Sequence, residues 1–189
     1  SGVITRRDNL AVGFAKNELK NRMLMFTNLS LPDEIVKQTF GVDDSSEWNL
    51  KKARLSAKNE NIDDSIKRYY YRPFDSRWIY YSDAIISRTC RKVMKHMLQD
   101  NIALITTRII PETESKGAFV SDMVGDIHTI SGQCYFFPLY SYRLYPVGQK
   151  FEQVKEPNLK AEFLNAIKER YGRASTFEEI FCYIYGVLY

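Results

Sequence analysis

The sequence predicts an α+β fold in which a central mixed or antiparallel sheet has helices before and after it. Two changes of pattern carry this prediction. Apolar residues recur at helical spacing in residues 16–40 and again after residue 158, whereas residues 102–137 alternate with the period of two that half-buried strands show. With 44% hydrophobic residues among 189, the chain can bury the core of one domain, or of one domain with a small appendage.

Residues 3–26 are predicted to form an extended segment followed by a helix. Residues 3–14 alternate loosely and contain a turn at Arg7–Asn9. The helix is expected over residues 16–26, because apolar side chains recur there at helical spacing, at Leu19, Met23 and Phe26.

A second helix is expected to begin after Ser30 and to end near Phe40. Ser30 can cap its start, a proline and two acids follow in the first turn, and Gly41 can end it. After an acidic loop, the residues Trp48–Leu55 and Asn59–Ile66 predict two short helices, or one helix and an irregular segment.

Two strands joined by a turn come next, followed by another helix. Tyr69–Tyr71 and Trp78–Tyr81 have the aromatic composition of strands, and Pro73–Ser76 can turn between them. Ser87 can cap a helix over Thr89–Leu98. The buried face of this helix would consist of Val93, Met94, Met97 and Leu98.

The last part of the chain is predicted to contain the remaining strands and two helices. The strand candidates are residues 102–107, 118–120, 128–130 and 133–137. The sheet is expected to end at Pro138, and a helix follows at about residues 160–171. Thr176 and Glu179 form a capping-box pattern that opens a last apolar helix through Leu188.

The segment Ile66–Met97 combines cationic and aromatic residues. It holds eight Lys or Arg and two Asp, a net charge of +6, whereas the whole chain nets +4. The aromatic residues between these charges are Tyr69, Tyr70, Tyr71, Phe74, Trp78, Tyr80 and Tyr81. Cations among aromatics are what a polyanion with stackable bases attracts. The alternative is a sheet core of aromatics with a solvated rim of cations.

The candidate nucleic-acid contacts lie on the predicted helix 89–98, at the turn and at separate positions. The helix carries a stripe without acids, formed by Arg88, Arg91, Lys92 and Lys95. Such a stripe favours phosphate contact, because a solvated helix face usually mixes signs. At the turn, Asp75 could pair with Arg72 or Arg77 and hold the chain, whereas an unpaired Arg could bind guanine or straddle a phosphate.

The other candidates are expected to divide between phosphates and base edges. Lys67 and Arg68 would join the helix in fixing register on phosphates, while loops near Arg77, Arg108 and His128 approach base edges. His128 could donate to a phosphate or close a turn. His96, beside a lysine on the predicted helix, is expected to face the surface or a phosphate rather than act as a general base.

A catalytic function rests on few residues. Asp100, Glu114 and Lys116 imitate the spacing of acids and lysine in magnesium-dependent nucleases, but Glu114 follows Pro111 in a polar loop, whereas that chemistry needs its two acids on adjoining strands. The sequence contains no G-x-S-x-G, P-loop or G-x-G-x-x-G motif. We therefore expect a fragment that is not an enzyme and holds no cofactor.

The cysteines and the apolar runs indicate a cytoplasmic protein without a membrane partner. The cysteines, Cys90, Cys134 and Cys182, are odd in number and far apart, and the sequence contains no CxxC and only two histidines. Reduced thiols are therefore expected, rather than a disulfide framework or a zinc site. No apolar run approaches the roughly 18 residues that a membrane span needs, and no signal peptide opens the sequence.

Several motifs in order resemble the carboxy-terminal target-recognition (specificity) region of Type ISP restriction–modification enzymes. They are YYYRPFDSRWIYYS from Tyr69, SRTCRKVMKHM from Ser87, NIALITTR from Asn101, FFPLY from Phe136 and EEIFCYIYGVLY from Glu178. The opening SGVITRRDNLAV is similar to the segment that leaves the methyltransferase core of these enzymes. The motif residues themselves are Arg72, Pro73, Phe74, Asp75 and Arg77.

The resemblance implies a domain that reads a short asymmetric sequence in double-stranded DNA. It implies that S-adenosylmethionine, ATP and magnesium belong to other parts of the parent enzyme, and that the methyltransferase domain of the same polypeptide is a partner. Both ends of the sequence look cut, and members of the family continue beyond the position of Tyr189.

Residues 1–60 are expected to be a helical coupling segment leading in from the methyltransferase core. Residues 61–189 are expected to be the recognition domain, either separate from that segment or one domain with it. Two alternatives stay open: a metal-dependent nuclease fragment, and a coupling module whose basic strip docks an acidic surface of its own parent chain.

Overall fold

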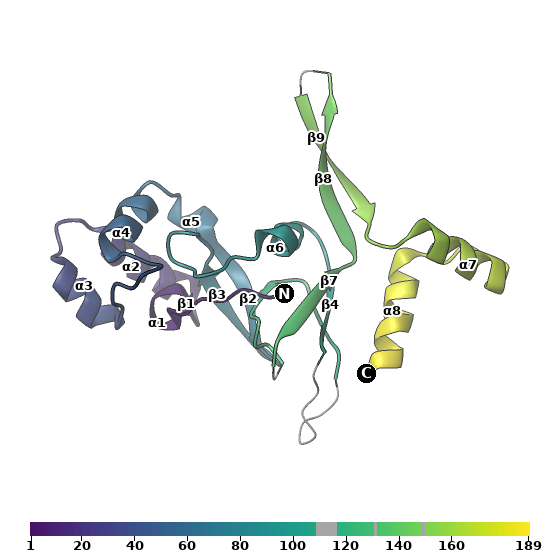
Figure 1. The fold of residues 1–189 in the computed structure, drawn as a ribbon, viewed down its shortest axis with the longest axis horizontal. Helices are drawn as coiled ribbons and strands as arrows, with labels where there is room; N and C mark the ends of the chain where they lie inside the picture. The colour runs from purple at the N-terminus through teal and green to yellow at the C-terminus, as the bar shows by residue number, and fades with distance from the viewer. Residues whose placement is uncertain (109–116, 131, 149) are drawn as a thin grey trace.

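A computed structural model of the chain describes residues 1–108, 117–130, 132–148 and 150–189. It confirms the predicted α+β class. Helices α1 to α5 lie on one side of an elongated molecule, strands occupy its middle, and α7 and α8 lie on the other side (Figure 1).

The described strands form two sheets and a separate ribbon rather than one central sheet. The first sheet, in the order β1-β3-β2-β6, consists of Val12–Gly13, Asp75–Tyr80, Ile66–Arg72 and Val124–Gly125. It is mixed, because β2 pairs antiparallel with β3 and parallel with β6. The second sheet, in the order β5-β4-β7, is antiparallel and consists of Phe119–Ser121, Ala103–Thr107 and Cys134–Pro138. The ribbon pairs β8 (Tyr140–Val147) with β9 (Lys150–Pro157).

The helices of the first part follow the apolar spacing closely. Helix α2 (Lys16–Thr27) buries the three predicted residues Leu19, Met23 and Phe26. Helix α3 (Asp33–Phe40) ends at Gly41, which has the left-handed φ of 60° that glycine adopts without strain. Helices α4 (Leu50–Lys58) and α5 (Ile62–Ser65) confirm the two short helices.

Two predicted details of this part are wrong. Ser30 does not cap α3, because Pro32 occupies the position before the helix and no side chain caps it. The expected turn at Arg7–Asn9 is instead the start of a short helix, α1 (Asp8–Ala11), which buries Leu10 and Ala11.

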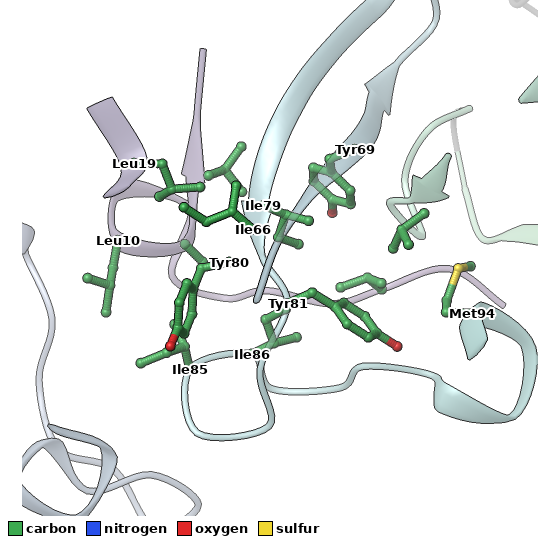
Figure 2. Close-up of a cluster of buried hydrophobic side chains, with 14 of the residues drawn as sticks. Leu10, Leu19, Ile66, Tyr69, Ile79, Tyr80, Tyr81, Ile85, Ile86 and Met94 are labelled. Carbon is green, nitrogen blue, oxygen red and sulfur yellow. The ribbon is translucent and has the colours of Figure 1, made fainter. Parts of the chain in front are cut away.

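The hydrophobic core lies between these helices and the first sheet. Figure 2 shows Leu10 and Leu19 from the helices close to Ile79 and Tyr80 of the strands, with Met94 farther along the same layer. A smaller apolar cluster joins the second sheet to the last helix, and its buried members are Leu104, Ala118, Leu139 and Phe181.

Buried tyrosines make the fold sensitive to alkaline pH. Burial raises the pKa of Tyr81 to about 12, and it raises the pKa of Tyr69 and of Tyr80 well above the ordinary phenol value. Because the folded pKa lies above the unfolded one, each group adds stability below pH ~10, and this stability is lost as the pH rises through the folded pKa.

We expect these phenols to ionise together with unfolding, and Tyr81→Phe to flatten the fall of stability between pH ~10 and ~12. Tyrosinate absorbance followed beside circular dichroism measures this. The exposed Tyr183→Phe is the control, and an unchanged fall in Tyr81→Phe would contradict the prediction.

The second half of the chain departs further from the predicted elements. Residues 128–130 are a turn rather than a strand, and β6 lies earlier. The second sheet ends at Pro138 as predicted, but two strands that were not predicted, β8 and β9, follow and project from the body of the molecule (Figure 1).

The two final helices are confirmed. Helix α7 spans Ala161–Tyr171, and α8 spans Phe177–Leu188. The capping box is present: the Thr176 hydroxyl accepts from the Glu179 backbone N–H at 3.1 Å, and the Glu179 carboxylate accepts from the Thr176 N–H at 2.9 Å. None of the helices in the described ranges has the length and apolar content that crossing a bilayer requires.

Candidate nucleic-acid interface

The Arg-Pro-Phe-Asp motif forms the tip of the β2–β3 hairpin. Arg72 pairs with Asp75 across the two strands, and Pro73 and Phe74 make the loop between them. Of the two pairings that the sequence allowed, the Asp75 carboxylate takes Arg77, which donates from Nε at 3.0 Å and from Nη2 at 2.7 Å. This contact raises the pKa of the Arg77 guanidinium. The guanidinium also lies 3.9 Å from the Tyr71 ring centroid and 4.4 Å from that of Phe14.

Arg72 is held by a different carboxylate, that of the buried Asp126, which joins β2 to the turn after β6. Its Nη1 lies 3.1 Å from Oδ1 of Asp126, a side chain that is only 6% exposed. The same carboxylate accepts from the Tyr69 hydroxyl at 2.5 Å and from the His128 backbone N–H at 2.7 Å. Both motif arginines therefore hold the hairpin in place: Arg77 through the predicted pairing with Asp75, and Arg72 through a pairing with Asp126 that was not predicted.

His128 closes a turn, which is one of the two functions considered for it. Its side chain is exposed, and Nδ1 lies 3.1 Å from the Gly132 carbonyl oxygen. The structure thus brings His128 and Arg72 together on Asp126.

The prediction of a cationic stripe without acids on this helix is wrong in two respects. Helix α6 spans Arg91–Met97 and begins after Cys90, which has a left-handed φ of 51°, so Ser87 does not cap it. Arg88 lies outside the helix and pairs with Ile4 in an isolated bridge. The stripe also meets an acid, because Asp83 accepts from Arg91 Nε at 2.7 Å.

Lys92 and Lys95 are the exposed cations that α6 keeps available. Neither makes an ion pair with any residue that the structure describes. His96, on the same helix, does not face a phosphate: its Nδ1 accepts from the Tyr142 backbone N–H at 2.9 Å and so fastens α6 to β8. Burial lowers the pKa of His96, in the direction that favours the neutral ring with which Nδ1 can accept.

The remaining candidates lie on strands or directly after one. Lys67 is half-buried on β2, whereas its neighbour Arg68 is exposed. The guanidinium of Arg68 lies 5.7 Å from the Trp78 ring centroid, and Lys16 of α2 lies 5.8 Å from the same ring. Arg108 is exposed after the end of β4, 5.0 Å from the Tyr135 ring.

These residues do not form one patch. Helix α6 ends before β4 begins, and Arg108 follows the last residue of β4. A strand of five residues spans roughly 17 Å, so Arg108 and α6 lie at opposite ends of the second sheet (Figure 1).

The β8–β9 ribbon was not predicted, and it adds further exposed cations. Lys155 of β9 lies 3.0 Å from the Asp100 carboxylate and 4.3 Å from the Tyr140 ring centroid. Tyr140 and Tyr142, which alternate with other residues, and Gly148, a residue suited to a tight turn, are the sequence signals that could have revealed the hairpin.

The nuclease alternative gains no support. Asp100 is paired with Lys155, and its proposed partners Glu114 and Lys116 lie outside the described residues. Among the residues whose positions are described, no three His, Cys, Asp or Glu side chains gather as metal ligands would. The cysteines there, Cys90, Cys134 and Cys182, are free thiols.

The chain is similar in fold to parts of several much larger proteins. It matches the DrdV–DNA complex, solved by cryo-electron microscopy, with a TM-score of 0.66 and 19% identity, covering 99% of this chain and 19% of that one. It matches the ATP-dependent Type ISP restriction–modification enzyme LlaBIII bound to DNA with a TM-score of 0.67 and 19% identity, covering 99% of this chain and 12% of that one. A nuclease-deletion mutant of the Type ISP enzyme LlaGI with a DNA substrate mimic matches with a TM-score of 0.54 and 19% identity, over 90% of this chain and 15% of that one.

Sequence comparisons complete the assignment. A comparison with curated protein sequences finds no match. The family described as the Type ISP C-terminal specificity domain matches residues 1–189, which confirms the resemblance seen in the motifs. Because this match spans the whole chain, the chain belongs to the Type ISP C-terminal specificity domain family.

Proposed function

We propose that the chain recognises a specific sequence in double-stranded DNA on behalf of a larger restriction–modification enzyme. The observation that carries this proposal is the family match over residues 1–189, since that family is a specificity domain. Three proteins of similar fold are described as DNA complexes, which supports the same conclusion. Methylation, ATP hydrolysis and cleavage would then belong to other parts of the enzyme, together with S-adenosylmethionine, ATP and magnesium.

The geometry divides two tasks between two groups of cations: the lysines of α6 would contact phosphates, and the motif arginines would position the hairpin loop. Lys92 and Lys95 are exposed on α6 and free of ion pairs among the described side chains, so they can meet phosphates without first breaking a contact. Arg72 and Arg77 are held by carboxylates and would position the hairpin loop instead. Loops near Arg108 and His128 would approach base edges. The helices of residues 1–60 would connect this surface to a methyltransferase core.

The salt dependence of binding tests the phosphate contacts. Each contact contributes about 0.9 to the slope of log K against log salt, so Lys92→Ala with Lys95→Ala should flatten the slope by about 2 and weaken binding to all duplexes alike. Fluorescence anisotropy with random-sequence duplexes over a range of salt concentrations measures both effects.

Two exposed lysines at the start of α4 provide the matched control. Lys51→Ala with Lys52→Ala removes the same charge from a helix on the far side of the first sheet, and it should leave the slope unchanged. Equal flattening by both double variants would remove α6 from the interface. If the unaltered chain failed to bind any duplex at low salt, the coupling module would replace DNA recognition as the function.

A further inference from the structure

Phe74 occupies a backbone conformation that its side chain disfavours, and nothing in the described core requires its ring. Its φ is 63°, in the left-handed region, which is a genuine outlier for a bulky residue. The side chain is 94% exposed, so it adds little buried apolar surface to the fold. The pattern of Pro73 followed by a positive φ is that of a type II turn, in which Gly or Asn would serve folding better at the position of Phe74.

The residues around Phe74 fix the loop while leaving its ring outside. The two guanidinium groups of Arg72 and Arg77 lie 4.0 and 3.9 Å from the ring centroid of Tyr71. The Tyr71 hydroxyl in turn donates to Asp8 at 2.8 Å. The ring of Phe74 has an edge contact with Phe119, with the centroids 6.0 Å apart. The hairpin is thus held on both strands, and the aromatic ring stands at its tip.

We propose that Phe74 contacts DNA by stacking its ring on a base or wedging it beside a base step in a groove. This inference rests on the proposed function and names a contact within it. A ring that projects from a loop held by two paired arginines, with a single edge contact to Phe119, matches the geometry of an aromatic wedge. Stacking explains why an exposed aromatic ring is kept at a strained position, because every base offers a π face. A rigid loop also places the ring without further ordering cost on binding.

The decisive variant is Phe74→Gly, which removes the ring and the backbone strain together. We expect the thermal midpoint to stay the same or rise, because glycine adopts a positive φ freely. We expect affinity to fall about 5- to 100-fold, in line with the loss of one stacked base. The slope against salt should not change, because no charge is removed. The probes are duplexes that the unaltered chain selects from a randomised pool, with a fluorescent base analogue at each position to report unstacking.

Other substitutions separate the ring from the loop. Phe74→Tyr keeps the ring and should keep the affinity. Phe74→Asn removes the ring and introduces a residue that tolerates the left-handed region, so it should lose affinity as Phe74→Gly does. This variant replaces Phe74→Gly in the test if the glycine variant fails to fold. Phe163→Ala, at another exposed aromatic on α7, should bind normally.

The outcomes distinguish this inference from the proposed function. If the unaltered chain selects no duplex, DNA recognition itself is wrong. If it selects duplexes, and Phe74→Gly or Phe74→Asn binds them as tightly, the stacking contact is wrong and DNA recognition stands. A loss of affinity with unchanged base-analogue fluorescence at every position would also overturn the stacking contact.

Discussion

Replacing Arg54 by Met is expected to destabilise the chain by about 4 kcal/mol, a large part of the 5–15 kcal/mol typical of a domain. Arg54 is only 2% exposed. Its guanidinium donates to the carbonyls of Phe26, Asn28 and Leu31 at 2.9, 2.5 and 2.9 Å, and it pairs with the carboxylate of Asp33. Methionine fills similar space but donates nothing, so the buried carbonyl of Phe26 and the part-buried carbonyls of Asn28 and Leu31 lose their donor.

Urea unfolding measures this loss, and a neighbour on the same helix provides the control. Lys58→Met changes an exposed residue of α4 and should shift the free energy of unfolding by no more than about 0.5 kcal/mol. A loss below about 1 kcal/mol in Arg54→Met would mean that water replaces the guanidinium at these carbonyls.

Arg54 also shows where prediction from sequence succeeds and fails. Helix α2 could be predicted because its burial follows from the spacing of Leu19, Met23 and Phe26, which the sequence displays directly. Arg54 lies in a polar stretch, and its burial follows from carbonyl partners more than 20 residues away. Such partners become visible only when the helices are packed together.

The β8–β9 ribbon was missed for a related reason. A half-buried strand shows a period of two because one of its faces is apolar and the other polar. Both faces of this ribbon are largely exposed beyond its base, with Leu144 on β8 and Phe151 on β9 open to solvent. Beyond Tyr140 and Tyr142 at its base, the sequence therefore carries no alternation that would mark the segment as a strand pair.

In the candidate site, too, contacts between residues close in the sequence could be predicted, and contacts between residues far apart in the sequence could not. The pairing of Asp75 with Arg77 could be foreseen, because the two residues are two positions apart on β3, next to the turn. The pairing of Arg72 with Asp126 could not, because 54 residues separate them and the parallel contact of β2 with β6 brings them together. On α6, the left-handed Cys90 delays the helix and leaves Arg88 outside it.

Replacing Asp126 by Ala is expected to destabilise the chain by roughly 3 kcal/mol, because its carboxylate holds two side chains of β2 and the backbone N–H of His128 in its own turn. The hydroxyl of the fully buried Tyr69 would lose its acceptor, and Arg72 would lose its ion pair. Asp126→Asn keeps an acceptor oxygen without the charge and should cost about half as much. Urea unfolding of both variants measures these losses.

A double-mutant cycle separates the contact with Tyr69 from the rest of the junction. Once Asp126 is Ala, Tyr69→Phe removes a hydroxyl that has already lost its partner, so it should cost at least 1 kcal/mol less than in the unaltered chain. Asp63→Ala, which removes an exposed ion pair with Lys20, should leave the free energy of unfolding nearly unchanged and is the control. Additive losses at Asp126 and Tyr69 would show that their 2.5 Å contact contributes nothing to stability.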